Sequence, residues 1–536
     1  MTSPNASAFA GTGILARIAL HTGWKRLALW VLGLIGMMLV TTASLSALYD
    51  TAEKLAAYSQ SLDGDAMLVL NGKVAGLETM GGVFANEFGF VLAFGLPLMG
   101  IALASRGTRQ DEEAGRLELL LAARIGHRAP ILAAVLVTGG ALLITGLGSA
   151  AVMIAFDADV TGSLLYGLGM AALGFVFAGV TVFAAQFFEH NRAVWGFGLA
   201  VTVISYLLRG QGAVNDNWLL WLSPHGWVDE ARAFGDARAW PLLLAGGVGL
   251  GLTAVAFYLN TRRDVGSALI RPRTAAARAS RLLRSPVGLA VYEHRGAVLG
   301  WSIGTVALMG TYGSLTQEVL NAFRDNPDLA VLVGADPNAA DRLLGAVLST
   351  FVMILAILVA AFFVMAVNSL RREEAAARLE ADLSGSRSRY GWLGTHVLVI
   401  GAGALIIAAA GAVVLATTTA SSTGDDTWTG EILSAAVSFS PSVVIFGGIA
   451  VALFGARPTW QVFGWVLFAF AAIVAYLGPG FDLPEWLVKA SPFAGIGADI
   501  INDGASATGT GVLLGTTVAL LLVGLVTFRR RNIPAA

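Results

Sequence analysis

Long apolar stretches separated by short polar segments constrain this chain more than any other feature of its sequence. A helix that crosses the roughly 30 Å hydrocarbon core of a bilayer needs about 20 mainly apolar residues, because each residue rises 1.5 Å. The chain is 56% apolar and only 13% charged, with a mean hydropathy of +0.72, a balance that is not typical of soluble domains. Spanning helices are predicted at residues 27–48, 84–104, 130–155, 163–188, 193–208, 241–260, 297–316, 347–368, 392–418, 431–455, 460–478 and 511–528. The predicted fold class is therefore an all-α polytopic membrane protein with twelve transmembrane helices.

The basic residues indicate the orientation, since Lys and Arg accumulate in the cytoplasmic loops of membrane proteins. With loops on alternating sides and both termini inside, 26 of the 34 Lys and Arg residues fall in inside segments and 8 in outside segments. Both termini are therefore expected in the cytoplasm, with the chain in a bacterial plasma membrane. The formal net charge of -1 gives no reason to expect a nucleic-acid partner.

An arginine-rich inside segment divides the predicted helices into two groups of six. It contains eight Arg and no Lys. Contact with anionic lipid headgroups would account for these charges without any further role. The predicted domains are a cytoplasmic interfacial segment, a first six-helix half, this linker, a second six-helix half and a cytoplasmic tail, at residues 1–26, 27–260, 261–296, 297–528 and 529–536.

The second inside loop of each half carries the same charged motif. Residues 109–118 read RQDEEAGRLE, and residues 371–380 read RREEAAARLE. At a constant separation of 262 residues, Arg109 matches Arg371, and the acidic, Arg and Leu positions recur in the same order. Because six spans is an even number, both halves point the same way and form a parallel duplication.

Two weaker sequence matches between the halves support the duplication. A Ser-Pro pair, at residues 223–224 and again at 491–492, follows a Trp-Leu pair and precedes the last predicted span of each half. In the first span of each half, Trp30 and Gly33 match Trp301 and Gly304.

Each repeated loop is predicted to contain a short charged helix. Glu112 and Arg116 are four residues apart with the acid on the N-terminal side, which favours an ion pair along a helix. Glu374 and Arg378 repeat this arrangement. A solvated charged helix end would explain the charges alone. Loops of about 24 residues, however, exceed what adjacent spans require, and mixed charges beside apolar residues favour docking onto a partner.

A duplicated twelve-span chain with an R-x-x-E-E-A-x-R-L-E loop after its second span resembles the permeases of type-2 ABC exporters. More narrowly, it resembles the actinobacterial permeases called exporters of polyketide antibiotics, or tetronasin-type resistance transporters. The resemblance covers nearly the whole chain and is strongest at residues 105–129. It is looser at residues 369–391, where Ala375 replaces the acid found at Glu113.

The resemblance implies an exporter that moves lipophilic, antibiotic-like compounds out of the cell. In such permeases the two loops are coupling helices seated on ATP-binding subunits, of which two copies are expected. The residues that would contact these partners are Arg109, Asp111, Glu112, Glu113, Arg116, Leu117, Glu118, Arg371, Glu373, Glu374, Arg378, Leu379 and Glu380. Residues 14–26 resemble the family's interfacial elbow helix, and an ordinary basic flank before a span fits them equally well.

The sequence lacks motifs for chemistry on this chain itself. No G-x-x-x-x-G-K-[ST] loop occurs, so ATP and Mg²⁺ are expected on the partner subunit. The six His residues are scattered without metal-ligand spacing and there is no Cys, so no cofactor, metal site or catalytic residue is predicted. The chain is therefore expected to be a transporter subunit and not an enzyme.

The alternative is a proton-driven multidrug antiporter of the major-facilitator type, which also has twelve spans in two parallel halves. Gly107, Asp111 and Arg116 only approximate the short G-x-x-x-D-R-x-G-R loop of that family. Proton relays use carboxylates inside the membrane, whereas Glu87 lies near the end of a predicted span. The sequence therefore favours ATP-driven export.

The cargo is the least constrained property. Aromatic residues in the spans would suit a small lipophilic substrate, but for each of them taken singly packing or lipid contact is the favoured explanation. The candidates are Phe90, Phe94, Trp195, Phe351, Trp460 and Phe463. The predicted outside segments 49–83 and 317–346 look helical. The resemblance implies that segments 221–236 and 486–503 are short outside helices that help to close the exit of the transport path, and plain surface helices would fit them equally well.

Overall fold

The computed structural model describes residues 8–61, 68, 71–121, 125–270, 280, 282–325, 340–375, 378–384, 388–477, 484–497 and 499–532. Within these ranges the regular structure is helical throughout, without strands. Eleven helical segments are long and apolar enough to cross a membrane. The predicted all-α fold with many membrane-spanning helices is thus confirmed.

The number of spans differs from the prediction at one place. Helix α12 (Pro286–Asp325) covers the predicted span 297–316 but is not among the eleven apolar segments. The middle of α12 carries four Gly residues together with Ser, Thr and Tyr, which dilute its apolar character. A count of twelve therefore stays a prediction.

The chain divides into two compact units, Met1–Ala275 and Ala276–Ala536, which are called unit 1 and unit 2 below. The division lies inside the predicted linker 261–296, whose residues 271–279 and 281 lie outside the described part of the chain. Residues 286–296, assigned to the linker from the sequence, already belong to α12. Each unit is described by itself.

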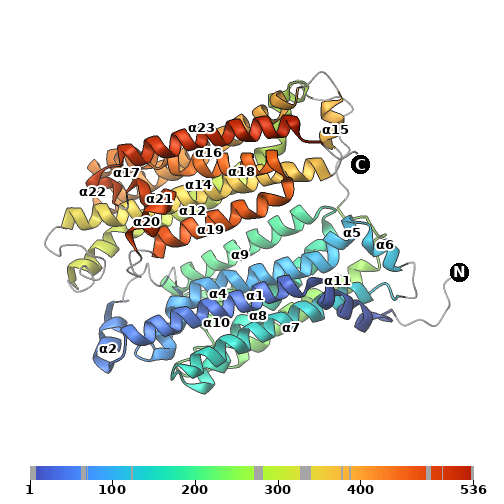
Figure 1. The fold of residues 1–536 in the computed structure, drawn as a ribbon. Helices are drawn as coiled ribbons and strands as arrows, with labels where there is room; N and C mark the ends of the chain where they lie inside the picture. The colour runs from blue at the N-terminus through green and yellow to red at the C-terminus, as the bar shows by residue number, and fades with distance from the viewer. Residues whose placement is uncertain are drawn as a thin grey trace. The chain divides into compact units, whose positions relative to one another are not determined.

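Unit 1 contains six long helices and several short ones (Figure 1). They are α1 (Thr12–Leu48), α2 (Ala52–Ser61), α4 (Met80–Ser105), the π-helical turn η1 (Arg106–Gln110), α5 (Asp111–Glu113), α6 (Arg116–Leu121), α7 (Ala129–Ala155), α8 (Val160–Phe187), α9 (Asn191–Val214), η2 (Trp218–Leu222), α10 (Pro224–Asp229) and α11 (Trp240–Asn260). The predicted span 193–208 is the middle of the longer helix α9.

Helix α8 is the centre of unit 1, because it packs against α4, α7, α9 and α11. Small residues let the backbones approach closely: a Cβ added to Gly146 of α7 would clash with the carbonyl oxygen of Gly167 of α8. Small residues at contacts between membrane helices have this effect in general, because there van der Waals packing replaces the hydrophobic effect. Glycine therefore sets the α7–α8 distance.

Unit 2 has a corresponding set of helices (Figure 1). They are η3 (Leu282–Arg284), α12 (Pro286–Asp325), α14 (Ala340–Ala375), α15 (Arg378–Leu383), α16 (Arg389–Thr423), α17 (Thr427–Ser438), α18 (Ser440–Ala456), η4 (Pro458–Trp460), α19 (Gln461–Leu477), α20 (Glu485–Ala490), α21 (Pro492–Ile496), α22 (Ile500–Asp503) and α23 (Ala507–Arg530). The predicted span 431–455 is built from α17 and α18, which join at Phe439 just before Pro441.

The long helices of the two units have matching neighbours. In unit 1, α1 packs on α7, α4 packs on α8 and α9, and α8 packs on α11. In unit 2, α12 packs on α16, α14 packs on α18 and α19, and α18 packs on α23. Taken in chain order, these are the same helix pairs.

The start of the chain departs from the elbow expected from the sequence. Residues 12–26 are not a separate interfacial helix, because α1 runs without a break from Thr12 to Leu48. The residues before α1 are held in place, since the amide of Gly126 donates to the carbonyl of Ala10 (2.9 Å) and the amide of Arg128 to that of Ala8 (3.0 Å). Leu15 of α1 is buried against Ala129 and Ala133 of α7.

Candidate functional site

The repeated loop of unit 1 is two short helices instead of one. Helix α4 passes through the π turn η1 into α5, the chain turns at Gly115 with a φ of +68°, and α6 begins at Arg116. The predicted ion pair between Glu112 and Arg116 is therefore wrong, because the left-handed turn at Gly115 ends the helix between them. The Nε of Arg116 instead donates to Asp111 Oδ1 at 3.0 Å.

Glu112 is the acceptor of a buried network that anchors this loop. Arg109 Nη1 donates to its Oε2 at 2.8 Å, and Arg263 Nη2 donates to the same oxygen at 3.0 Å. The amide of Gly266 donates to Oε1 at 2.7 Å. The side chains of Arg109, Glu112 and Arg263 are 1%, 3% and 6% exposed. The loop is therefore fixed to the segment that follows α11.

Arg109 extends this anchor to a third part of unit 1. Its Nε donates to the carbonyl of Glu189 at 2.7 Å, and both of its terminal nitrogens lie 3.1 Å from the carbonyl of Ser267. Removing one member of a buried, hydrogen-bonded ion pair leaves a charge uncompensated and costs about 3–5 kcal/mol. The network therefore makes a rigid junction between α4, the start of α9 and the end of α11.

Glu113 contacts the start of α9. Its Oε1 accepts from the amide of Asn191 at 2.9 Å and lies 3.3 Å from His190 Nδ1. A carboxylate at this place satisfies an otherwise unpaired amide and lies at the positive end of the helix dipole. Glu113 thus links the loop to α9.

The repeated loop of unit 2 continues α14 to Ala375 and resumes as α15 at Arg378. The predicted pair between Glu374 and Arg378 is also wrong. Arg378 Nη2 donates to Glu373 Oε1 at 2.8 Å, because Glu374 is engaged elsewhere. Arg531, directly after α23, donates from Nη2 to Glu374 Oε2 at 2.8 Å.

The same contacts recur at matching positions of the two loops. Asp111 with Arg116 and Glu373 with Arg378 occupy equivalent places in the repeat, and each pair spans five residues across a helix end. The next acid in each loop, Glu112 or Glu374, pairs with an arginine that follows the last long helix of its unit. Each unit therefore ties its charged loop to its sixth long helix.

The remaining predicted residues are placed differently in the two loops. Arg371 is exposed, whereas its counterpart Arg109 is buried, and the methyl group of Ala375 has no acceptor to repeat the contact of Glu113. Leu117 is half-buried and Leu379 is buried at 1% exposure. Arg116, Glu118, Arg378 and Glu380 are exposed. Both loops thus present a charged outer surface.

Two comparisons with known proteins bear on this arrangement. The family described as the C-terminal domain of the multidrug efflux system permease Rv1217c matches residues 283–529. The multidrug efflux system permease protein Rv1217c of Mycobacterium tuberculosis is 31% identical over 534 residues, which are 98% of this chain and 96% of the relative. The chain belongs to this family of multidrug efflux permeases. It is therefore a multi-pass protein of the plasma membrane.

The Ser-Pro pairs of the permease begin short helices in both units, α10 and α21. Ser223 Oγ donates to the carbonyl of Ser205 in α9 at 2.6 Å, and Ser491 Oγ donates to the carbonyl of Ala471 in α19 at 2.8 Å. Each short helix is thereby attached to the fifth long helix of its unit. The sequence analysis identified the two matching Ser-Pro pairs but did not predict which helices the serines contact.

Next to Ser223, unit 1 of the permease contains three largely buried polar residues that the sequence analysis did not single out, namely Arg209, His225 and Asp229. His225 Nδ1 lies 2.7 Å from Ser205 Oγ, and its Nε2 lies 2.9 Å from the carbonyl of Ala93, so Nε2 carries the proton. Burial, helped by Arg209, lowers the pKa of His225 to about 3. Burial raises the pKa of Asp229 to about 6, against the effect of Arg209 3.8 Å away. The corresponding Phe493 of unit 2 stacks on Phe446.

The aromatic substrate candidates do not form one site within either unit. Phe90 and Phe94 lie 5.1 Å apart by ring centroids, and both contact Tyr206 of α9. Phe351 stacks on Tyr312 at 4.7 Å. Trp195 is half-buried beside the core of unit 1, and Trp460 and Phe463 are exposed. Tyr206, which the sequence did not single out, completes the cluster on α4 and α9.

The arginine partners of the loops were also missed, although a signal existed. Arg263 follows Arg262 directly after the sixth predicted span, and Arg531 ends the run of Arg529 and Arg530 after the last span. Among the residues that the structure describes, no group of three or more His, Asp and Glu side chains is placed to hold a metal ion.

Proposed function

We propose that this permease is the membrane subunit of an ATP-driven exporter of the type-2 ABC class, and that it moves lipophilic, antibiotic-like compounds out of the cell. Two copies of a separate ATP-binding subunit, which would carry ATP and Mg²⁺, would dock on the loops at residues 105–129 and 369–391. Twelve spans with both termini in the cytoplasm are part of this proposal. The relative that is 31% identical is itself described as the permease of a multidrug efflux system.

The observation that carries the proposal is the pair of matching ion-pair sets in the two loops. Asp111 with Arg116 and Glu373 with Arg378 hold the short helices α6 and α15 in the same way. Their outer surfaces expose both charge signs, which suits docking on a protein surface of complementary charge. Two similar docking segments in one chain fit two copies of one partner.

The buried contacts provide a route for movement. Glu112 and Glu374 connect the loops to arginines that follow α11 and α23. A partner that moves α6 or α15 would therefore move the sixth long helix of the same unit, since buried charged contacts resist separation. Rocking of one half against the other is the usual transport movement of such duplicated proteins.

Substrate passage would involve the aromatic groups of the spans and the outside segments. Phe90, Phe94 and Tyr206 offer flat apolar surfaces, of which Phe90 is 41% exposed. The helices α10 and α21, attached to α9 and α19 by serine, would help to close the exit. Phe351, Trp195, Trp460 and Phe463 stay weaker candidates.

The test is co-expression of the permease with a candidate ABC ATP-binding protein from the same organism, followed by purification through a tag on the permease. We expect co-purification and a vanadate-sensitive ATPase that lipophilic drugs stimulate. A permease that purifies alone, shows no ATPase and moves drugs across vesicles on a pH gradient would overturn the proposal in favour of the antiporter.

A further inference from the structure

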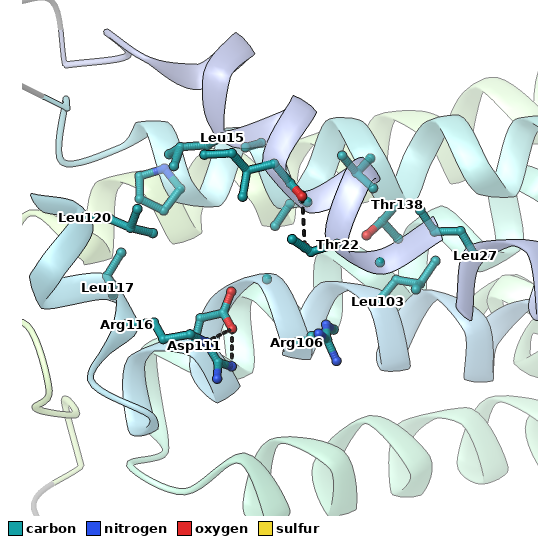
Figure 2. Close-up of a pocket in the computed structure, with 18 of the residues that line it drawn as sticks. Leu15, Thr22, Leu27, Leu103, Arg106, Asp111, Arg116, Leu117, Leu120 and Thr138 are labelled. Carbon is teal, nitrogen blue, oxygen red and sulfur yellow. Dashed lines mark hydrogen bonds and ion pairs between the residues drawn. The ribbon is translucent and has the colours of Figure 1, made fainter. Parts of the chain in front are cut away.

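Unit 1 contains a cavity of about 480 Å³ beside the first turns of α1. Three segments that are far apart in the sequence form its walls, namely α1, the stretch from Leu103 to Leu120, and the first turns of α7 (Figure 2). Most of the lining side chains are aliphatic, including Leu15, Leu27 and Leu117. Cavities of about 300–1,000 Å³ with mainly apolar walls are typical of sites for small molecules.

The charged residues of the cavity are mainly positive. Arg26, Arg106 and Arg116 line it together with Asp111. Arg116 is bonded to Asp111, as the dashed lines in Figure 2 show. Within the described part of the chain, the guanidinium groups of Arg26 and Arg106 make no hydrogen bond or ion pair to a side chain or a carbonyl. The cavity thus combines apolar walls with two arginines that lack a protein anion.

The equivalent place in unit 2 is narrowed by larger side chains. Continuing the separation of 262 residues from the loops places Pro130 and Ala134 of α7 at Trp392 and His396 of α16. These two rings lie 4.5 Å apart by centroids and are 3% and 4% exposed.

An alignment of the first long helices, α1 and α12, points to the same place in unit 2 as the counterpart of the cavity. The separation of 271 residues between Trp30 and Trp301 places Leu15 at Pro286. Pro286, Trp392 and His396 line a space of only about 130 Å³. The larger cavity of unit 1 therefore goes together with smaller side chains, Pro130 and Ala134, at the two positions of α7 that match Trp392 and His396.

We propose that the cavity of unit 1 binds one anionic phospholipid from the adjacent bilayer leaflet, with an acyl chain between α1 and α7 and the phosphate at Arg26 and Arg106. Helix α1 is long and apolar enough to cross a membrane, and the turns that line the cavity lie before or at the start of the predicted span 27–48, so the cavity would open at the headgroup level of the bilayer. Arg26 and Arg106 supply the uncompensated positive charge of the cavity, and basic residues near a membrane surface attract anionic lipids.

A lipid at this place would connect α1 to the charged loop. Leu117 and Leu120 of α6 and the Asp111–Arg116 pair form one wall of the cavity (Figure 2). An effect of the lipid on transport would rest on the proposed function of the loop, whereas its binding does not. Binding is therefore the property to measure.

The experiment is native mass spectrometry of the full-length chain with phosphatidylglycerol or phosphatidylcholine of identical acyl chains. We expect one retained phosphatidylglycerol per chain, at least tenfold preferred over phosphatidylcholine. The double variant Arg26→Gln with Arg106→Gln should lower phosphatidylglycerol occupancy at least tenfold. Ala19→Trp, which fills the cavity from α1, should do the same, and Thr22→Trp replaces it if that variant does not fold.

The matched control is Arg17→Gln with Lys25→Gln, which removes two charges from the same helix without changing the cavity lining. Its phosphatidylglycerol occupancy should stay within twofold of the unaltered chain. An equal loss in this control, retention in the filled variant, or no preference between the two lipids would overturn the proposal. Displacement of the lipid by an uncharged lipophilic dye at equimolar concentration would assign the cavity to cargo and would also overturn it.

Discussion

In unit 1 the charged loop after the second long helix is anchored by a buried arginine, Arg109, and by Glu113 at the start of α9. In unit 2 the matching positions are the exposed Arg371 and Ala375, which make neither contact. The pairs of Asp111 with Arg116 and their counterparts in unit 2 are nevertheless kept. The contacts that both loops share thus hold the short helices α6 and α15 and tie each loop to the arginine after its sixth long helix, whereas the contacts that differ add further attachments in unit 1 alone.

The difference between the two loops separates residues that would serve docking on a partner from residues that would serve the stability of unit 1. Features required by a partner that docks twice should recur in both loops, and features required by the folding of one unit need not. The buried junction of Arg109 would therefore serve stability, and the shared pairs would serve docking. The predictions below test this division, beginning with the largest expected effect.

Replacing Arg109 should damage the permease far more than replacing Arg371. Arg109→Ala leaves Glu112 buried beside one arginine instead of two, and we expect the free energy of unfolding to fall by about 3–5 kcal/mol. Arg371→Ala changes an exposed side chain and should alter it by less than about 0.5 kcal/mol. Thermal unfolding of the purified full-length chain measures both. Equal losses in the two variants would remove the distinction between the loops.

The segments that contain α10 and α21 should differ in how their stability depends on pH. Burial raises the pKa of Asp229 to about 6, so between about pH 4 and pH 6 the folded chain holds a proton that the unfolded chain has released. The free energy of unfolding should therefore fall as the pH rises through this window, by on the order of 2 kcal/mol, and level off above it.

Asp229→Asn should abolish this part of the pH dependence, and thermal midpoints measured from pH 4.5 to pH 7 check the prediction. Phe493→Leu, in the apolar segment of unit 2, is the matched control and should leave the slope unchanged. A slope that persists in Asp229→Asn would assign the titration to another group.

Glu113 should contribute the smallest of the three effects. Glu113→Ala removes an acceptor from the amide of Asn191, and loss of such a helix-end contact costs about 1 kcal/mol. The reciprocal change Ala375→Glu should give unit 2 no comparable gain. Thermal midpoints measured at low and high salt check both, because the helix-dipole part of the effect is screened by salt. A stabilisation by Ala375→Glu equal to the loss in unit 1 would show that the loops differ less than proposed.

The sequence predicts the spans well because hydropathy is a local property. Ten predicted spans, from residues 84–104 to 511–528, fall on helical segments whose ends lie within several residues of the predicted ones, whereas α12 is too rich in Gly to count by composition. The break between α17 and α18 escapes prediction, although Pro441 marks it. The apolar content of a segment predicts that it is helical, but it does not predict where the helix is interrupted.

The site is predicted less completely because its contacts are not local. The charged motif locates both loops, yet Glu112 pairs with Arg263, which lies 151 residues away, and not with Arg116. The positive φ at Gly115 ends the helix on which the predicted pair depends. The larger cavity of unit 1 goes together with Ala134 being small where His396 is large, and the sequence reveals this only when the repeat is aligned.

Docking of both loops on the ATP-binding subunit is the central claim, and the chain suits a direct test because it contains no Cys. Glu118→Cys and Glu380→Cys place single thiols on the exposed surfaces of α6 and α15 and can be labelled with a photoactivatable maleimide. Asp236→Cys and Asp425→Cys, in predicted outside segments, are the controls. We predict that light cross-links both loop positions, and neither control, to the co-expressed ATP-binding subunit. Cross-links from the controls but not from the loops, or from no position in a complex that remains assembled, would contradict the account.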